Sequence, residues 1–253
     1  MNTTTIEAPE VTNHRVVSSE QWLAERKAFL AREKELTHLR DQIARERRAL
    51  PWERVQKNYV FDTPEGKRTL ADLFKGRSQL LVQHFMLGSG WEQGCPSCSY
   101  MADHTDGMLV HLEHRDVSFV AVSRGPLADL ERFRQRMGWK FRWVSSSGND
   151  FNRDFHVSFT KDEMAKDAEY NYTVDKIPSE ELPGLSAFIR DENGKVFHTY
   201  SSYARGLDTL VWTYNFLDMA PKGRDEGALP WTMAWVRRHD EYEDKPKGSS
   251  CCA

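Results

Sequence analysis

The sequence predicts an α/β domain in which a central mixed sheet is flanked by helices and preceded by a helical extension. Two apolar runs, at residues 79–87 and 117–122, have the composition of buried strands, and a helical pattern follows each of them. Two further strand patterns flank a turn at residues 191–194 and predict a hairpin. Alternating strands and helices build parallel sheets, and a hairpin adds antiparallel strands, so we expect a mixed sheet.

The composition is that of a folded domain rather than of a nucleic-acid-binding or membrane protein. The 253 residues are 39% hydrophobic and 29% charged, with a net charge of −3, so a core of ordinary size is available and no basic excess is present. Residues 1–13 lack the features of a secretory signal, and no apolar run approaches the roughly 18 to 20 residues of a membrane span. We therefore expect a cytoplasmic protein with neither nucleic acid nor membrane as a partner.

The N-terminal part is expected to contain disorder and then a helix. Residues 1–17 are predicted to be disordered, and residues 18–50, dense in Arg, Glu, Leu and Ala, to form one long amphipathic helix. Ser18 and Gln21 supply a capping pattern at its start, and Pro51 ends it. Such a helix packs on its own domain or on a second subunit, which makes a homodimer a possible partner arrangement.

Residues 51–238 are predicted to form the domain, and residues 239–253 a flexible tail. The polar stretch 160–181, which includes Pro178, is predicted to be a surface insertion. Pro126 lies where Pro is favoured, in the first turn of a helix. The predicted elements are, in order, extended segments over 52–66, strand 79–87, helix 99–112, strand 117–122, helix 126–137, hairpin strands 185–189 and 195–200, and a closing helix 207–219.

The motif that carries chemistry is a pair of cysteines, Cys95 and Cys98, separated by Pro96 and Ser97. When the first cysteine of such a pair lies at a helix N-terminus, both sulfurs meet at one spot. The free backbone N–H groups and the helix dipole then stabilise a thiolate and lower its pKa. Cys95 is therefore predicted to be the nucleophile and Cys98 the resolving thiol. A position after a buried strand and before a helix favours redox use of such a motif.

Metal binding is the main alternative use of these cysteines, because His111 and His114 follow Cys98. Zinc sites of two cysteines and two histidines have three to five residues between the histidines, whereas only two lie here. On one continuous helix the imidazoles would also lie about 15 Å from the cysteines along the axis. We therefore predict no metal and no cofactor.

Several residues near the motif are candidates for supporting roles. His84, in the strand that leads to the motif, could accept a proton from Cys98, or it could be a core histidine bonded to a backbone carbonyl. Trp91 and Tyr100 could form an apolar rim, or could simply pack. Arg124 could stabilise a thiolate or an anionic substrate, although a solvated surface position is the ordinary use of arginine. Pro96 and Ser97 complete the predicted substrate rim.

Several segments resemble the domain-of-unknown-function family 899 over about residues 18–238. The matching segments are 59–66, 84–86, 94–99, 120–124, 137–139 and 198–206, of which the last is quite specific. Members of this family are described as thioredoxin-like and as predicted dithiol-disulfide oxidoreductases. The resemblance therefore implies a thioredoxin-like fold and, as a prediction, thiol-disulfide exchange.

Comparison with the wider thioredoxin superfamily adds residue-level expectations. His84 falls where thioredoxins keep a buried Asp, and Gly94 stands where they have Trp. The cis-proline that faces the dithiol in thioredoxins falls at Leu185 or Ser186, so these two residues join the predicted rim, while Pro183 lies slightly too early. The hairpin around residues 191–194 looks more like the peroxiredoxin branch. The peroxiredoxin pattern of Pro and Thr or Ser before the reactive cysteine is nevertheless not met, so peroxidase activity stays open.

The sequence thus predicts an oxidoreductase that reacts with a protein or small-molecule disulfide and is served by a thiol electron donor. The alternative is a non-enzymatic binding or dimerisation module with an inert or metal-filled dithiol, which would use Trp139, Phe141 and Trp143 as exposed aromatics. Cys251 and Cys252 could resolve a mixed disulfide or shuttle electrons, or could be incidental.

Overall fold

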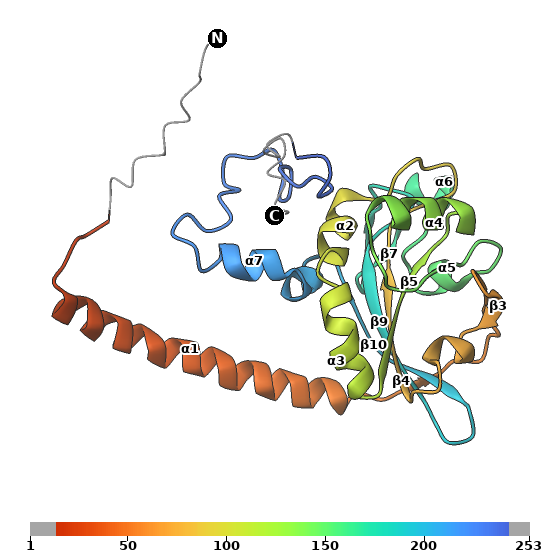
Figure 1. Cartoon of the computed structure of the whole chain (residues 1–253), viewed down its shortest axis with the longest axis horizontal. Helices are drawn as coiled ribbons and strands as arrows, with labels where there is room; N and C mark the ends of the chain where they lie inside the picture. Colours follow the sequence, from red (N-terminus) through yellow and green to blue (C-terminus); the bar gives the residue numbers. More distant parts are fainter. Residues whose placement is uncertain (1–13, 243–253) are drawn as a thin grey trace, which may run out of the picture. The chain divides into compact units, whose positions relative to one another are not determined.

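The computed structural model describes residues 14–242 and divides the chain into two units, Met1–Leu50 and Pro51–Ala253. The described part of the first unit is dominated by helix α1, Ser19–Arg48. Its N-terminus is a capping box, in which the Ser18 hydroxyl accepts from the Gln21 N–H and the Gln21 side chain accepts from the Ser18 N–H. Basic residues in its last turn complement the helix dipole. The predicted N-terminal helical extension is confirmed (Figure 1).

The second unit is built on an eight-stranded mixed sheet with strand order β1-β10-β9-β4-β5-β6-β2-β3. Strands β4, β5 and β6 are parallel to one another, and every other neighbouring pair in this sheet is antiparallel. Its strands are β1 (Glu53–Arg54), β2 (Val60–Thr63), β3 (Gly66–Thr69), β4 (Gln79–His84), β5 (Val117–Ser123), β6 (Trp143–Ser145), β9 (Gly184–Arg190) and β10 (Val196–Tyr203).

The connections that identify the fold lie in four neighbouring strands of the sheet, β10, β9, β4 and β5. Parallel strands β4 and β5 are joined through helices, and the antiparallel hairpin of β9 and β10 lies against β4. Helix α7, Trp212–Leu217, closes this part of the chain. The order β10-β9-β4-β5 with these connections is a thioredoxin-like fold, as the sequence predicted.

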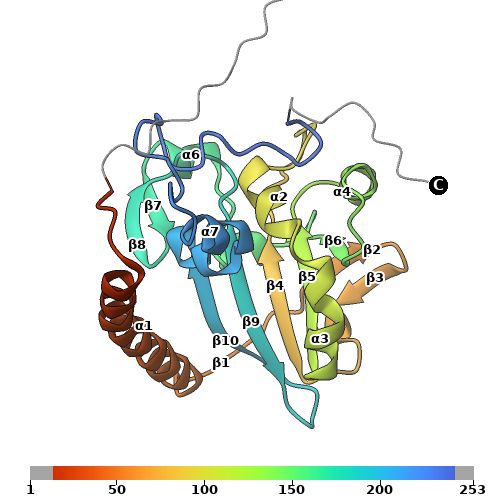
Figure 2. The same ribbon diagram turned by 60° about the vertical axis from the view of Figure 1, so that its left-hand side comes forward.

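The helices cover both faces of the sheet. Alternate residues of β5 point to opposite faces, so Val120 and Val122 join one buried cluster and Ala121 another. The second cluster includes residues from α2 (Pro96–Ala102) and α4 (Leu127–Arg136), and Figure 2 shows α2 and α3 (Leu109–His114) lying across β4 and β5. The first cluster includes residues from the short helices η1 (Ala71–Phe74) and α5 (Phe151–Asp154).

One predicted helix, over residues 99–112, is broken in the structure. Helix α2 ends at Ala102, a short 3-10 helix η2 (Asp106–Met108) follows, and α3 begins only at Leu109. The two aspartates at the break bond to a neighbouring segment: Asp103 accepts from the Trp139 indole, and Asp106 accepts from two backbone N–H groups. At the point where the helix is interrupted, both carboxylates therefore have hydrogen-bond partners in residues 139–141. The predicted closing helix is likewise divided, into η3 (Ala204–Leu210) and α7.

The predicted exposure of Trp139, Phe141 and Trp143 is wrong. All three are buried, with at most 5% of their surface exposed, and they pack against one another and against Phe85. The chain turns their rings inward beneath α4, whose Leu130 and Phe133 belong to the same buried cluster. These rings belong to the core of the domain and are not free for dimerisation.

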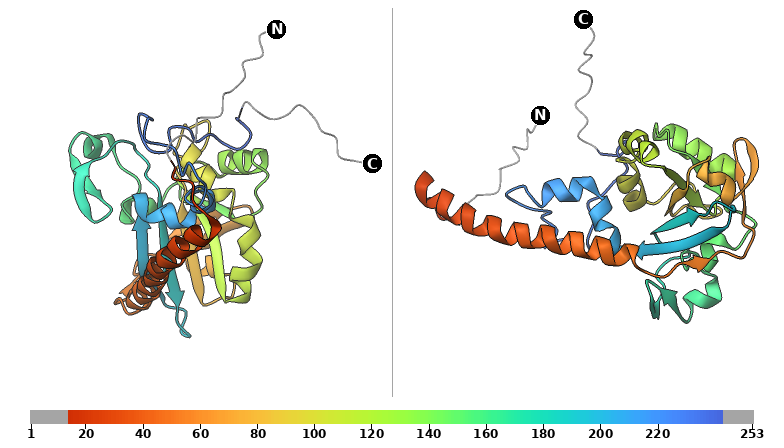
Figure 3. Two further views of the ribbon diagram at one scale, coloured as in Figure 1. Left: turned by 90° about the vertical axis from the view of Figure 1, so that its left-hand side faces the viewer. Right: turned by 90° about the horizontal axis from the view of Figure 1, so that it is seen from below.

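The stretch 160–181 contains helix α6 (Lys161–Met164) and a separate two-stranded sheet of β7 (Asp167–Tyr170) and β8 (Thr173–Lys176). Figure 3 shows this hairpin projecting beside the main sheet. A small apolar cluster that includes Phe159 and Ile177 anchors it. Across residues 14–242, no helix combines the length and the apolar character that crossing a membrane requires.

Candidate functional site

The two cysteines lie at the start of α2. Cys95 is the N-cap residue, Pro96 occupies the first turn, and Cys98 is one turn further on. The Cys95 N–H donates to the Met86 carbonyl at 3.0 Å, which ties the helix start to the end of β4. Both cysteines are free thiols; Cys98 is buried and Cys95 is partly exposed. Cys95 is therefore the more accessible of the two thiols.

The surroundings separate the pKa values of the two thiols. Hydrogen bonding from the Cys98 thiol, from the backbone N–H groups of Cys98 and Ser97 and from the Ser97 side chain stabilises a Cys95 thiolate. Together these donors outweigh burial and lower the pKa of Cys95 to about 6. The same contact with Cys95, together with burial, raises the pKa of Cys98 well above its ordinary value. Cys95 is therefore suited to be the nucleophile, and Cys98 needs help in losing its proton.

This difference predicts the pH dependence of alkylation. Because the pKa of Cys95 is lowered to about 6, its thiolate fraction rises as the pH passes through 6, and the rate of its reaction with iodoacetamide should level off above about pH 7. In Cys98→Ala the largest stabilising donor is lost, so the midpoint should move upward. Stopped-flow alkylation from pH 4 to 10 measures the midpoint with and without Cys98→Ala. Both proteins carry Cys251→Ser and Cys252→Ser. A wild-type midpoint near the ordinary thiol value would contradict the assignment.

The residue before the nucleophile has to be glycine. A Cβ on Gly94 would lie 2.6 Å from Phe85 and 2.7 Å from Phe133, so the rings below leave no room for a side chain. The Gly94 carbonyl accepts two hydrogen bonds from Arg238, at 2.9 and 2.6 Å. Arg238 is mostly buried and also pairs with Glu241. Sequence reasoning missed Arg238, because nothing local indicates that a residue 144 positions away lies at this helix start.

His84 is fully buried, with only 1% of its surface exposed. Its ring stacks on Phe151 and Phe155, and its Nε2 lies 2.8 Å from the Ser186 hydroxyl, while Nδ1 has no hydrogen-bond partner. Burial, together with the nearby His198, lowers the pKa of His84 to about 3, so the imidazole is neutral near pH 7. The partner is thus a serine hydroxyl and not the backbone carbonyl of the core-histidine alternative.

Two rim candidates meet at a pair of glutamates. The Trp91 indole donates to Glu180 at 2.6 Å. The Arg124 Nε donates to Glu181 at 2.7 Å, and the Arg124 Nη2 lies 3.8 Å from the Glu180 carboxylate. Glu181 is buried, which raises its pKa, and it also accepts from the Ser158 hydroxyl. Arg124 is therefore an ion-pair partner and not a solvated surface residue. Sequence reasoning missed both glutamates because they lie at the end of the predicted insertion.

The prediction of rim positions for Tyr100 and Ser186 is corrected by the structure. Tyr100 is buried and packs edge-on against Tyr214 and Trp235, so its ring is core. Ser186 is completely buried, because β9 is an interior strand of the sheet. Leu185 is half-buried and packs against the same cluster as Tyr100.

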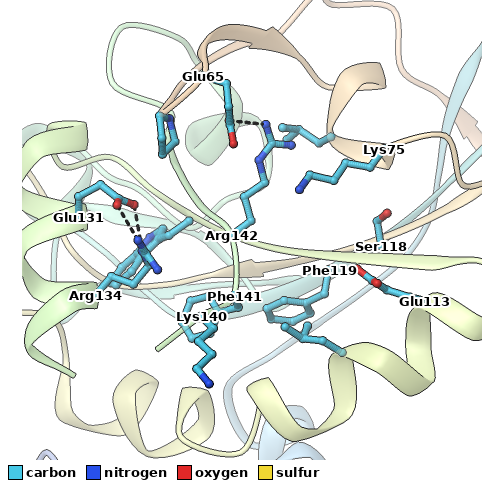
Figure 4. A pocket seen from close by; sticks show the side chains of 14 residues that line it. Glu65, Lys75, Glu113, Ser118, Phe119, Glu131, Arg134, Lys140, Phe141 and Arg142 are labelled. Carbon is cyan, nitrogen blue, oxygen red and sulfur yellow. Dashed lines mark hydrogen bonds and ion pairs between the residues drawn. The ribbon is translucent and has the colours of Figure 1, made fainter. Parts of the chain in front are cut away.

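A cavity of about 350 Å³ lies elsewhere on the domain, and no residue of the predicted dithiol site lines it (Figure 4). Two of the basic side chains that line it form ion pairs: Arg142 with Glu65, and Arg134 with Glu131. Within residues 14–242, no group of three or more His, Cys, Asp or Glu side chains is arranged to hold a metal ion. Cys251 and Cys252 lie outside the described residues.

Comparison with known proteins yields one family and a set of distant structures. The model of a family described as "Bacterial protein of unknown function (DUF899)" matches residues 11–242. Peroxidoxin BcpB from Mycobacterium tuberculosis is similar at 14% identity and a TM-score of 0.43, over 65% of this chain and 95% of that chain. A variant of peroxiredoxin Q from Xanthomonas campestris is similar at 14% identity and a TM-score of 0.45, over 66% and 98%. A comparison with curated proteins finds no match.

Proposed function

Because the chain belongs to the DUF899 family of bacterial proteins of unknown function, we propose its activity from its own site: thiol-disulfide exchange through Cys95 and Cys98. The observation that carries the proposal is a pair of free thiols at one helix start, with Cys95 partly exposed at the N-cap and Cys98 buried one turn further on. Their surroundings displace the two pKa values in opposite directions. A low pKa makes Cys95 a thiolate near pH 7, and a buried Cys98 that keeps its proton waits for the second step. An inert structural pair needs no such separation.

The reaction has two balanced steps. The Cys95 thiolate attacks one sulfur of a substrate disulfide, the S–S bond of the substrate breaks, and the sulfur that leaves takes up a proton from solvent. Cys98 then loses its proton and attacks the Cys95 sulfur, which releases the second substrate thiol and leaves a Cys95 to Cys98 disulfide. The substrate has gained two electrons, and an external thiol donor restores the dithiol. His84 is the proposed acceptor of the Cys98 proton, and Trp91, beside Arg124 and the two glutamates, borders the substrate.

The partners in this proposal are a protein or small-molecule disulfide and a thiol donor in the cytoplasm. The low pKa and partial exposure of Cys95 would also suit attack on a peroxide. In that reaction the Cys95 sulfur takes one oxygen, the O–O bond breaks, and the other oxygen of hydrogen peroxide leaves as water after taking up a proton; the Cys98 thiol then condenses with the sulfenic acid to give the disulfide and a second water. Hydrogen peroxide is therefore the second substrate to test.

A redox titration of the full chain tests the proposal. Cys251 and Cys252 are first replaced by Ser, so that only one pair reports. At defined ratios of reduced to oxidised glutathione, we expect a single two-electron transition between dithiol and disulfide, and turnover of oxidised glutathione with an added dithiol donor. No disulfide under oxidising ratios would overturn the proposal. Faster oxidation by hydrogen peroxide than by disulfides would favour the peroxidase.

A further inference from the structure

The last part of the described chain, residues 235–241, lies along the helix that carries the dithiol. Val236 is buried in one cluster with Tyr100 of α2. Further along, the Nδ1 of His239 lies 2.6 Å from the carboxylate of Asp103, the residue that ends α2. Figure 2 shows this part of the chain, in dark blue, beside α2. We call it the C-terminal segment.

Two arginines hold the C-terminal segment at the start of that helix. Arg238 donates to the carbonyl of Gly94, the residue before the nucleophile, at 2.9 and 2.6 Å. Arg136 of α4 pairs with Asp240 at 2.8 Å and also donates to Gln93 at 2.6 Å, so it joins the segment to the loop that leads to the dithiol. The Arg238 side chain is only 13% exposed. The segment is therefore anchored beside the dithiol by buried contacts of the fold.

From this anchor the chain continues to its second pair of cysteines. The four cysteines of the chain form two pairs, one at the start of α2 and the other at Cys251 and Cys252. Thirteen positions separate Arg238 from Cys251, and a chain of that length can span up to roughly 45 Å. An anchor at Gly94 thus leaves the second pair within reach of the first. A thiol joined to the site in this way acts at a far higher local concentration than a separate thiol in solution.

The second pair is poorly suited to form a disulfide with itself. Consecutive Cα atoms lie about 3.8 Å apart across a trans peptide bond, whereas the Cα atoms of a disulfide usually lie about 4.4–6.8 Å apart. A bond between Cys251 and Cys252 would be strained and easily reduced. Each of these thiols is better suited to a partner elsewhere in the chain, and Cys95 is the partly exposed cysteine of the first pair.

On the basis of the proposed function, we infer that Cys251 and Cys252 are further redox residues, which open the disulfide between Cys95 and Cys98 and pass its oxidising equivalents to the external thiol donor. A thiolate of Cys251 or Cys252, called here the tail thiol, attacks the Cys95 sulfur. The bond from Cys95 to Cys98 breaks, and the Cys98 sulfur takes up a proton.

Two donor thiols complete the cycle. The thiolate of the first attacks the sulfur of the tail thiol in the mixed disulfide, and Cys95 leaves as its thiolate. The thiolate of the second attacks the sulfur of the first donor, so the tail sulfur leaves and takes up a proton, and a donor disulfide forms. Two electrons have then passed from the donor to the dithiol. Because its pKa is lowered to about 6, Cys95 is a good leaving group in the first of these steps.

The first test asks whether a tail thiol bonds to Cys95. A full chain with Cys98→Ser and Cys252→Ser keeps only Cys95 and Cys251, and a parallel chain keeps Cys252 in place of Cys251. Each is treated with one molar equivalent of oxidised glutathione. In at least one of the two chains we expect both glutathiones to be released and Cys95 to be linked to the tail thiol, as read from intact-protein mass and a non-reducing digest. The rate should not depend on protein concentration, and a disulfide between two chains would overturn the inference.

The second test removes the anchor. Arg238→Ala deletes both hydrogen bonds to Gly94 and should slow formation of the link by about 10-fold relative to the alkylation rate of Cys95 in the same chain. Arg134→Ala is the matched control, because this arginine also pairs with a glutamate three positions away and donates to a backbone carbonyl, but lies outside the C-terminal segment. It should leave the ratio of the two rates unchanged. An unchanged ratio in Arg238→Ala would show that the anchor does not deliver the tail thiol.

The third test is turnover with a dithiol donor. Cys251→Ser with Cys252→Ser should lower turnover by about 10-fold, while the alkylation rate of Cys95 stays at the wild-type value. Equal turnover, or a glutathione that stays on Cys95 in the first test, overturns the role of the second pair and leaves the proposed function standing. A Cys95 that never takes up glutathione overturns the proposed function as well.

Discussion

Replacing Cys95 with Ser should lower the rate of the proposed thiol-disulfide exchange by roughly 1000-fold or more, because the variant lacks the sulfur that forms the first covalent bond in that reaction. The hydroxyl of serine does not ionise near pH 7, so the hydrogen-bond donors that lower the pKa of Cys95 have no anion to stabilise. Turnover of oxidised glutathione with a dithiol donor measures the loss.

Cys98→Ser provides the contrasting result. Cys95 still attacks in this variant, but the mixed disulfide has no internal thiol to resolve it and should accumulate as one glutathione per chain, visible by intact-protein mass. The Cys251→Ser and Cys252→Ser background keeps other thiols from resolving it. Equal activity of Cys95→Ser and the wild type would refute the assignment of the nucleophile.

Replacing Phe85 with Ala should lower the free energy of unfolding by about 3–5 kcal/mol, the usual cost of removing a buried aromatic side chain. Phe85 is 1% exposed, and its ring centroid lies 4.4 Å from that of Trp143 and 5.8 Å from that of Trp139. The surrounding rings are held by other contacts and can close the resulting cavity only in part. Urea unfolding of the reduced proteins measures the difference.

Phe216→Ala is the matched control, because the same ring is 69% exposed at that position. Its cost should stay within about 0.5 kcal/mol, as for surface substitutions in general. Phe85 also lies directly beneath Gly94, so the cavity in Phe85→Ala opens under the residue that precedes the nucleophile. A cost for Phe85→Ala no larger than that for Phe216→Ala would show that the aromatic cluster does not stabilise the domain.

The sequence alone determined the features that depend on neighbouring residues. The apolar runs of β4 and β5, the turn between β9 and β10, and the capping pattern of α1 are local signals, and the structure contains all of these elements. The position of Cys95 at a helix start follows from the same kind of signal, since a Cys-Pro pair after a buried strand marks the first turn. These signals were sufficient for the fold class and for the dithiol.

Only the tertiary structure decided which distant side chains surround the dithiol. Arg238 at Gly94, and Glu181 at Arg124, meet across long separations in the chain, for which one sequence contains no local signal. The break between α2 and α3 and the burial of Trp139 involve the same long-range contact, because Asp103 and the Trp139 indole bond to each other. The hydrogen bond between His84 and Ser186 exists because the sheet places β4 beside β9, an order that no local pattern specifies.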